Sequence, residues 1–328
     1  MVGVSGHPNL VLDGIRETPR VELVAVASGS CDESLTSFVA SAAAVGVCPK
    51  VYEDYRHMLD DERLDVLAVT PPFYQHSHVS IEALQRGCAV YCEKPAAISH
   101  EDLDKVRSAW QASGKPFGLM LNFRYDHCFY TAHQLVRDGL IGDPVLAYGQ
   151  KTYRFGQRPD FFRKRDTSGG LIPWVGIHAI DWCRWVSGRQ YTAVTANHAN
   201  AATPEYPGME DHAACLFEFD NGGSAVMAFD FLRPEGAATH GDDFLRLTGT
   251  RGYLEVRSPQ GLQVVTAEGP VPVSLSRPEY GPFADFLHSV MDPRHVCLVS
   301  AEDSFAVTEI ALRTRDAADG GQRVILRG

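Results

Sequence analysis

Two side chains in the sequence have the chemistry needed to move a proton to or from a hydroxyl group. Lys94 lies between Glu93 and Pro95, just after an apolar run. Its ammonium group could stabilise a developing alkoxide. His178 falls in a predicted helix with Asp181 one turn later, whose carboxylate could orient the imidazole as a general base. On residue type and position alone, Lys94 and His178 are candidates for catalytic residues. A solvated surface lysine and a core histidine are the structural alternatives.

Short apolar runs alternate with helical segments over the first third of the chain. The predicted strands are 2–5, 21–27, 66–69, 89–91 and 117–120, and the predicted helices between them include 34–45, 79–86 and 99–114. Such runs are typical of strands buried on both faces, so residues 1–120 are expected to form a Rossmann domain with a doubly wound parallel sheet. Lys94 would then follow the fourth of these strands, at the carboxyl edge where open α/β sheets bind ligands.

The pattern changes after about residue 120. Two helices, near 127–138 and 177–186, are followed by alternating strands joined by tight turns, one of them Asn221-Gly222-Gly223. The predicted strands are 213–219, 224–230, 244–248 and 253–255, and two last helices are expected near 282–291 and 301–318. We expect residues 121–328 to form a C-terminal α/β domain with an open, mainly antiparallel sheet.

The turn after the first predicted strand is a degraded form of a glycine-rich phosphate-binding fingerprint. Gly6 takes the place of the first glycine, whereas Pro8 and Val11 take the places of the second and third. Pro8 has no N–H to donate to a phosphate. A dinucleotide bound here would contact Gly6, His7, Pro8 and Asn9, and an ordinary strand-to-helix turn is the alternative.

The end of the second predicted strand bears on the choice between NADP and NAD. NAD sites usually carry Asp or Glu there to hold the ribose hydroxyls. The run Ser28-Gly29-Ser30 has no carboxylate to repel a 2′-phosphate, which favours NADP. However, no Lys or Arg between Arg20 and Lys50 would neutralise that phosphate, and Asp32 or Glu33 could hold the ribose instead. Both cofactors stay open.

The run from Cys88 through Glu93-Lys94-Pro95, with the upstream Val69-Thr70-Pro71-Pro72 and the helix 81–87, resembles the Gfo/Idh/MocA family. That family is named for glucose–fructose oxidoreductase and inositol dehydrogenase. Further similar motifs are the segment 121–125, the pair Gly169-Gly170, the segment 176–181, the turn 249–252 and the end of the last helix at 317–320. The likeness therefore extends over nearly the whole chain.

The resemblance implies a nicotinamide cofactor, NADP or NAD, and a sugar, cyclitol or related polyol as substrate. It also implies that Lys94 touches the reacting oxygen and that His178 is the acid/base group. A homo-oligomer, either a dimer or a tetramer, is expected by the same analogy. Beyond the glycine turn, the expected cofactor-binding residues are Ser28, Gly29, Ser30, Thr70, Pro71, His76, Glu93 and Lys94.

Trp174 departs from the family pattern, which commonly has an Asp one turn before the histidine. Tryptophan cannot accept a proton, but it could stack on a sugar face or on the nicotinamide. The segment 154–165 is rich in arginine and phenylalanine, and we expect it to bind substrate, with a solvated loop as the alternative. The expected substrate-binding residues are Trp174, Asp181, Arg124, Arg158 and Tyr153.

Composition excludes several classes of function. The net charge of −11 gives no basic footprint for nucleic acid and no attraction to anionic membranes. No window approaches a membrane helix, and no signal peptide is recognisable. The eight cysteines form no Cys-x-x-Cys pair, which indicates reduced thiols in a cytoplasmic protein. We expect no metal site, because His76, His78 and His240 lack metal-ligand spacing.

Three functions remain as hypotheses. The favoured one is an NAD(P)-dependent dehydrogenase or reductase, because Lys94 and His178 are both retained. The second is a redox-assisted glycosidase or epimerase with an internally recycled cofactor, which Trp174 would suit. The third is a non-enzymatic sugar sensor on the same fold, motivated by the degraded glycine turn and the missing carboxylate at Ser28.

Overall fold

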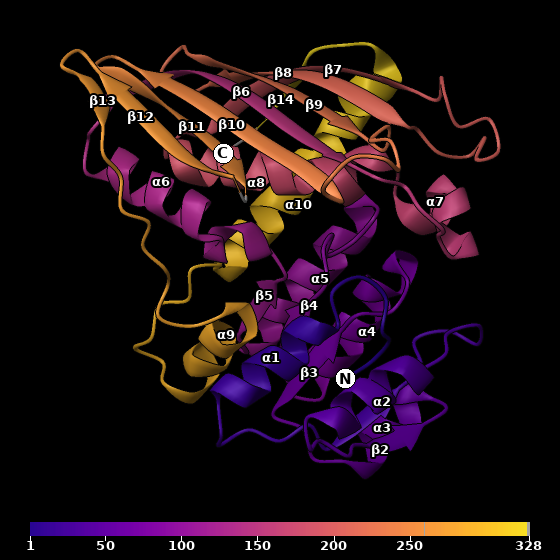
Figure 1. Ribbon diagram of the computed structural model, residues 1–328. Coiled ribbons are helices and arrows are strands. Elements are labelled where there is room, and N and C mark those ends of the chain that lie inside the picture. The colour runs from indigo at the N-terminus through magenta and orange to yellow at the C-terminus, as the bar shows by residue number, and fades with distance from the viewer. Residues whose placement is uncertain (259, 327–328) are drawn as a thin grey trace. The chain divides into compact units, whose positions relative to one another are not determined.

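The computed structural model describes residues 1–258 and 260–326, and it divides into two compact units (Figure 1). Unit 1 comprises Met1–Leu121 and Glu279–Thr308, and unit 2 comprises Asn122–Pro278 and Glu309–Gly328. A single boundary near residue 120 therefore does not describe the chain. The return segment 279–308, expected in the second domain, belongs to unit 1.

Unit 1 is built on short parallel strands with helices between them. The strands are β1 (Ala25–Ala27), β2 (Lys50–Tyr52), β3 (Val66–Val69), β4 (Ala89–Cys92) and β5 (Phe117–Leu119). The helices are α1 (Asn9–Glu17), α2 (Thr36–Ala44), α3 (Tyr55–Asp61), α4 (His76–Gln85), α5 (His100–Ser113) and α9 (Pro282–Met291).

The first expected strand, 2–5, is reduced to a single bridging residue. Val2 pairs in parallel with Ala27 of β1 on one side and with Val69 of β3 on the other. The strand order is therefore β2-β1-Val2-β3-β4-β5, and the direction of winding reverses at Val2. The expected doubly wound parallel sheet is confirmed, and its ligand-binding switch point lies where the chain leaves Val2.

Helix α9 explains why the return segment belongs to unit 1. Its apolar residues Phe283, Phe286 and Leu287 are buried. The rings of Phe283 and Phe286 lie 5.0 and 5.1 Å from the ring of Tyr91 in β4. The helix thus covers a sheet face that the first 121 residues alone would leave open, and burial of these aromatic rings favours the arrangement.

Unit 2 contains a nine-stranded sheet in the order β13-β12-β11-β10-β6-β9-β8-β7-β14. The strands are β6 (Pro144–Tyr153), β7 (Tyr191–Ala199), β8 (His212–Phe219), β9 (Ser224–Asp230), β10 (Gly241–Gly249), β11 (Gly252–Ser258), β12 (Gly261–Thr266), β13 (Gly269–Val271) and β14 (Val324–Ile325). Strands β6 and β9 pair in parallel, and the other described pairs are antiparallel. The expected open, mainly antiparallel sheet is confirmed.

Unit 2 also contains helical elements. They are α6 (His127–Arg137), α7 (Arg165–Ser168) and α8 (Ile177–Ser187), while α10 (Ala301–Gly320) belongs to unit 1 up to Thr308 and to unit 2 beyond it. Figure 1 shows α6 and α8 side by side beneath the sheet, and the rings of Phe129 and Trp182, which they contribute, lie 5.1 Å apart.

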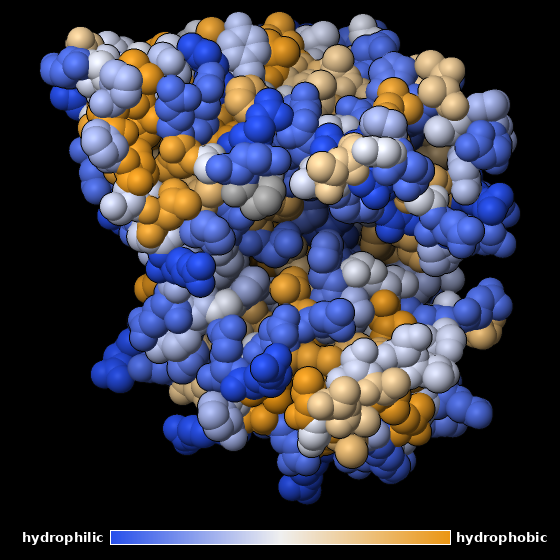
Figure 2. Space-filling view, viewed as in Figure 1, coloured by the Kyte–Doolittle hydropathy of each residue, from blue (hydrophilic) through white to orange (hydrophobic). Residues whose placement is uncertain are grey.

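The opposite face of the sheet carries exposed side chains, as the alternating burial along β8 and β9 requires. Figure 2 shows a largely polar face of the molecule, with apolar residues gathered over the β11–β13 end of the sheet. No helix within residues 1–258 and 260–326 is both long and apolar enough to span a bilayer.

Candidate active site

Lys94 lies just beyond the carboxyl end of β4, as predicted. Its side chain is buried, with the residue only 3% exposed, so it is not a solvated surface charge. Its Nζ atom lies 3.9 Å from Oε1 of Glu93 and 5.7 Å from the centroid of the Phe73 ring. Lys94 is therefore a buried cation beside a buried carboxylate at the ligand-binding edge of the sheet, and its contact with a ligand stays a prediction.

Glu93 is fully buried, and its carboxylate links Lys94 to the glycine turn. It accepts hydrogen bonds from the backbone N–H groups of His7, at 2.9 Å, and Lys94, at 3.1 Å, and Nδ1 of His7 lies 2.8 Å from Oε2. Burial alone would raise the pKa of Glu93, but the neighbouring His7 and Lys94 outweigh it and lower the pKa to about 2. The side chain is therefore an anion at neutral pH.

Gly6 faces this carboxylate and has a φ of +77°. A Cβ atom at this position would lie 2.4 Å from Oε2 of Glu93, which no real contact allows. Both the backbone conformation and the space therefore require glycine here. Gly6 is the one fingerprint glycine that the sequence retains, and it is the residue that packs against the Glu93 carboxylate.

The backbone around the switch point is closely packed. A Cβ atom at Gly29 would lie 2.1 Å from Cβ of Pro71, and Oγ1 of Thr70 donates a 2.6 Å hydrogen bond to the carbonyl oxygen of Gly3. Helix α1 follows this turn and has no acidic residue in its first turn, which leaves its positive end available to an anion. The cradle of glycine turn, Pro71 and Gly29 therefore fits a dinucleotide, even though Pro8 offers no N–H.

His76 connects the two loops that border this cradle. Its Nδ1 lies 2.7 Å from the carbonyl oxygen of Pro95, and its Nε2 lies 3.0 Å from that of Pro71. Burial lowers the pKa of His76, which favours the neutral ring with a single N–H to donate. The neutral ring lies between the Pro71 and Pro95 segments and can donate a hydrogen bond to only one of their carbonyl oxygens. Direct contact of His76 with a cofactor stays a prediction.

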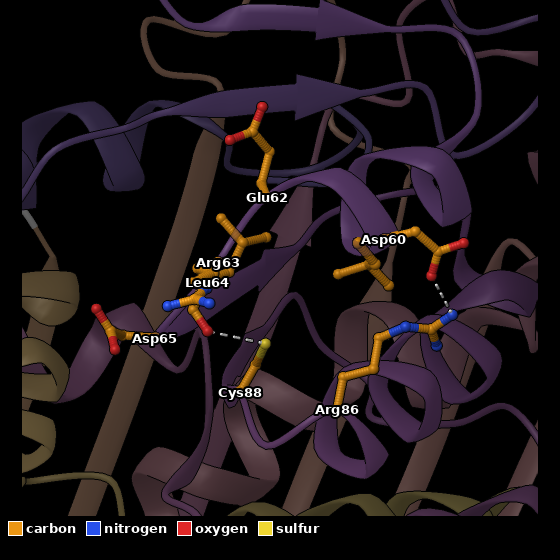
Figure 3. A pocket seen from close by; sticks show the side chains of 8 residues that line it. Asp60, Glu62, Arg63, Leu64, Asp65, Arg86 and Cys88 are labelled. Carbon is orange, nitrogen blue, oxygen red and sulfur yellow. Dashed lines mark hydrogen bonds and ion pairs between the residues drawn. The ribbon is translucent and has the colours of Figure 1, made fainter.

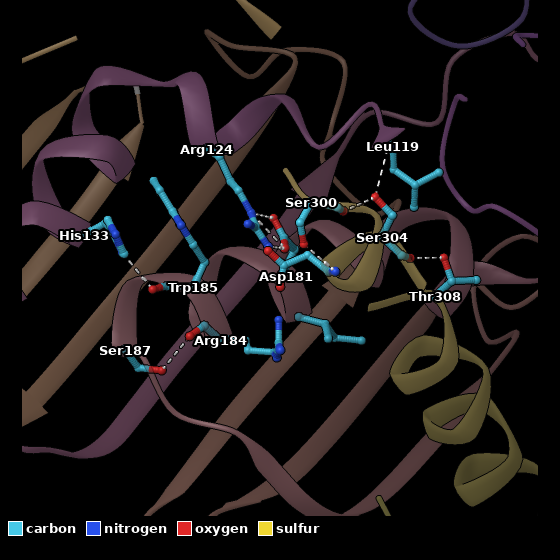
Figure 4. Close-up of polar contacts among 12 residues, drawn as sticks. Leu119, Arg124, His133, Asp181, Arg184, Trp185, Ser187, Ser300, Ser304 and Thr308 are labelled. Atoms are coloured by element: carbon cyan, nitrogen blue, oxygen red, sulfur yellow. Dashed lines mark hydrogen bonds and ion pairs between the residues drawn. The ribbon is translucent and has the colours of Figure 1, made fainter. Parts of the chain in front are cut away.

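In unit 2, His178 is the second residue of α8 and is 5% exposed. The ring of Phe123 meets the imidazole edge-on, with centroids 5.2 Å apart. Asp181 forms a forked ion pair with Arg124, with Nη2–Oδ1 at 2.5 Å and Nε–Oδ2 at 3.1 Å (Figure 4). Both partners are buried, so the pair fixes the segment 122–125 against α8. Orientation of His178 by Asp181 stays a prediction.

Trp174 is 4% exposed and lies within an aromatic cluster. Its ring centroid is 4.2 Å from that of Phe162 and 4.7 Å from that of Phe231, and the ring of Tyr153 meets it edge-on. The guanidinium of Arg158 lies 5.4 Å from the Trp174 ring centroid. Phe162 thus anchors the segment 154–165 in this cluster, while residues 156, 157, 159, 160, 163 and 164 of the segment are exposed. Binding of substrate by this segment stays a prediction. Stacking of Trp174 on a ligand is untested.

A buried ion pair in unit 2 escaped the sequence reasoning. Lys151 of β6 is the cross-strand partner of Asp243 in β10, and its Nζ lies 2.8 Å from Oδ1 of the carboxylate. Each residue is 7% exposed, and burial lowers the pKa of Lys151 and raises that of Asp243. Nζ also lies 4.4 Å from the centroid of the Phe123 ring, which in turn meets His178. The Phe123 ring thus contacts both the Lys151 ammonium group and the His178 imidazole.

A pocket in unit 1 lies away from Lys94. It is lined by Leu64 and Asp65, which precede β3, and by Arg86 and Cys88, which precede β4 (Figure 3). Arg86 forms a 3.1 Å ion pair with Asp60 there. Because it lies at the amino ends of these strands, we do not assign it to the cofactor. Among the described residues, no group of three or more His, Cys, Asp or Glu side chains could hold a metal ion.

All of the expected cofactor residues belong to unit 1, and the expected substrate-binding residues, together with the catalytic candidate His178, belong to unit 2. The first set is Gly6, His7, Pro8, Asn9, Ser28, Gly29, Ser30, Thr70, Pro71, His76, Glu93 and Lys94, and the second is Arg124, Tyr153, Arg158, Trp174, His178 and Asp181.

Comparisons with known proteins agree with this division. Residues 1–121 match the family model described as an oxidoreductase family with an NAD-binding Rossmann fold, and residues 129–255 match the model of the GFO/IDH/MocA C-terminal domain. A solved structure of a putative oxidoreductase from Thermotoga maritima is 38% identical, with a TM-score of 0.94 over 99% of this chain and 98% of that one.

Two of the curated relatives with named activities illustrate the similarity. A D-apiose dehydrogenase from Paraburkholderia graminis is 24% identical over 77% of this chain, and an inositol 2-dehydrogenase from Salmonella typhimurium is 28% identical over 53% of it. The chain covers 66% of the length of the first and 49% of the second, which is less than two thirds of either.

Proposed function

Because the chain belongs to the Gfo/Idh/MocA family of oxidoreductases, we propose that it transfers a hydride between a nicotinamide cofactor and a sugar, cyclitol or related polyol. The bound dinucleotide would supply the hydride donor or acceptor. The named activities of the two curated relatives, on D-apiose and on inositol, support a sugar or a cyclitol as the substrate class.

The burial of Lys94 beside Glu93 carries this proposal. Oxidation of a secondary alcohol needs a cationic donor at the oxygen, because negative charge develops there as the proton leaves. Lys94 is 3% exposed and keeps a full carboxylate neighbour, so its ammonium group is held in place and oriented. His178 would exchange the hydroxyl proton, which is the ordinary role of an imidazole near neutral pH.

Titration with NADH and with NADPH, followed by quenching of protein fluorescence, tests cofactor binding. Saturable binding of at least one dinucleotide is expected. If neither binds, the proposal fails.

Replacement of Lys94 by Ala tests the site. We expect turnover to be lost while dinucleotide affinity changes little, because the glycine turn, Pro71 and Gly29 remain. The matched control is Lys105→Ala, since Lys105 is 53% exposed on α5 and pairs with Glu101 on the same helix. Retained turnover in the Lys94 variant would remove Lys94 from the mechanism.

A redox-assisted glycosidase or epimerase is the second candidate, favoured by Trp174. The cluster around that ring places apolar groups where the family usually has a carboxylate, so proton handling differs from that of an ordinary member. A dehydrogenase accumulates reduced or oxidised dinucleotide, whereas this class recycles it. Product formed without net change in the dinucleotide would favour the second candidate.

We also propose that the chain assembles as a homo-oligomer through the outer face of the nine-stranded sheet. Tyr148, Val226 and Leu216 are cross-strand neighbours there and are 45, 43 and 48% exposed. Light scattering after size exclusion should give a dimer or tetramer, and Val226→Lys should lower the mass. The matched control is Leu275→Lys, at an exposed leucine outside the sheet. A monomeric parent chain would contradict this assembly.

A further inference from the structure

Glu33 connects two backbone segments of unit 1 through its carboxylate. Oε1 accepts hydrogen bonds from the backbone N–H of Val4, at 2.8 Å, and from Oγ of Ser5, at 3.0 Å. Oε2 accepts a 2.8 Å hydrogen bond from the backbone N–H of Gly29. Val4 and Ser5 belong to the turn after Val2, and Gly29 follows β1. The carboxylate therefore lies between the glycine turn and the end of the neighbouring strand.

This is the place where dinucleotide-binding sheets hold a ribose carboxylate. In most NAD sites that carboxylate belongs to the residue that ends the strand, here Ser28. In this chain, Oγ of Ser28 donates a 3.3 Å hydrogen bond to the carbonyl oxygen of Glu33, five residues later. The loop 28–33 thus folds back on itself. It brings the Glu33 carboxylate to the end of the strand, where Ser28 stands in place of the usual Asp or Glu.

The remaining bonding capacity of Glu33 suits a ribose hydroxyl. A carboxylate offers about four lone-pair positions, and three donors from the described residues reach this one. A hydroxyl can donate to the remaining position, whereas a 2′-phosphate cannot donate and is repelled by the negative charge. The N–H of Gly29, which would otherwise be available to a phosphate, is already bonded to Glu33.

We propose that Glu33 holds the adenosine ribose and makes the chain select NAD over NADP. The inference rests on the proposed function, because it assumes that a dinucleotide binds at the switch point. It reverses the preference that Ser28 and Ser30 suggest on their own, and it agrees with the absence of Lys and Arg from residues 21–49.

The test is the ratio of the dissociation constants for NADPH and NADH, measured by fluorescence quenching on the parent chain and on Glu33→Gln. The parent should bind NADH at least about tenfold more tightly, and the variant should lose about tenfold of that ratio. A loosened loop would weaken both dinucleotides together, so the ratio isolates the effect of the charge. The matched control is Glu101→Gln, at an exposed carboxylate on α5 that should leave the ratio unchanged.

A second readout is the rise in melting temperature at saturating NADH or NADPH. It should be larger with NADH for the parent, and the two values should converge for Glu33→Gln. Equal affinity of the parent for the two dinucleotides, or an unchanged ratio in Glu33→Gln, would overturn the assignment while leaving the oxidoreductase proposal standing. Binding of neither dinucleotide would overturn both.

Discussion

Replacement of Glu93 by Gln removes the buried charge that joins the glycine turn to Lys94. The pKa of Glu93 falls from an ordinary 4.5 to about 2 in the folded chain. At about 1.4 kcal/mol per pKa unit, the ionised carboxylate stabilises the folded state by about 3 kcal/mol at neutral pH. Burial opposes this gain, while His7 and Lys94 supply it. Glutamine keeps the shape and one acceptor but loses the charge.

The sign of the pH dependence follows from the direction of the shift. A carboxyl whose pKa is lowered by folding contributes its full stability above pH 4.5 and loses it as pH falls towards 2. Urea unfolding of Glu93→Gln without dinucleotide should therefore show a loss of about 3 kcal/mol at neutral pH that shrinks over this window. The surface variant Glu101→Gln should unfold like the parent. If the unfolding free energy of Glu93→Gln equals that of the parent at neutral pH, or stays lower by a constant amount down to pH 2, the reasoning is refuted.

Three further perturbations have defined outcomes. Trp174→Ala should lower the unfolding free energy by about 3–5 kcal/mol, because it leaves a cavity in a buried aromatic cluster. A change below about 1 kcal/mol in urea unfolding would contradict that packing. Asp243→Asn should lower the unfolding free energy by about 3–5 kcal/mol, because Lys151 stays buried without its counter-ion, and adding Lys151→Met should recover most of that loss. A double variant as unstable as the single one would contradict the pairing. Gly29→Ala should weaken NADH binding, because its Cβ would displace Pro71, and unchanged affinity by fluorescence titration would show that the cradle tolerates that displacement.

The fold class could be predicted from sequence because short apolar runs bounded by turns are typical of buried strands. The runs at 66–69 and 89–91 are adjacent parallel strands, and the turn at Asn221-Gly222-Gly223 joins the antiparallel β8 and β9. Strand β6 could not be found in this way, since its inward positions include Gly149 and Lys151, which break the apolar alternation. The return of α9 to unit 1 depends on contacts with Tyr91, nearly 200 residues earlier, and no local pattern encodes it.

The candidate site could be predicted in part, and for a similar reason. The position of Lys94 at the carboxyl edge of the sheet was predictable because the residue follows a strand, and strand ends converge at one edge of a parallel sheet. Its catalytic role was inferred from the family resemblance. The sequence offered Glu33 and Asp32 as alternative ribose partners, and only the contact of Glu33 with Val4, 29 residues away, distinguishes the two. The pair Lys151–Asp243 was not predicted, because its two residues lie 92 positions apart along the chain. Trp174 was visible as a departure, but its burial among Phe162 and Phe231 depends on the folded segment 154–165.

The most direct test of the central claim is net reduction of NAD or NADP by the purified chain, measured over a panel of cyclitols, aldoses and other polyols. The account predicts that reduced dinucleotide accumulates with at least one of them and that Lys94→Ala abolishes the accumulation while Lys105→Ala does not. Tight dinucleotide binding with no net reduction by any polyol, or full activity in the Lys94 variant, would contradict it.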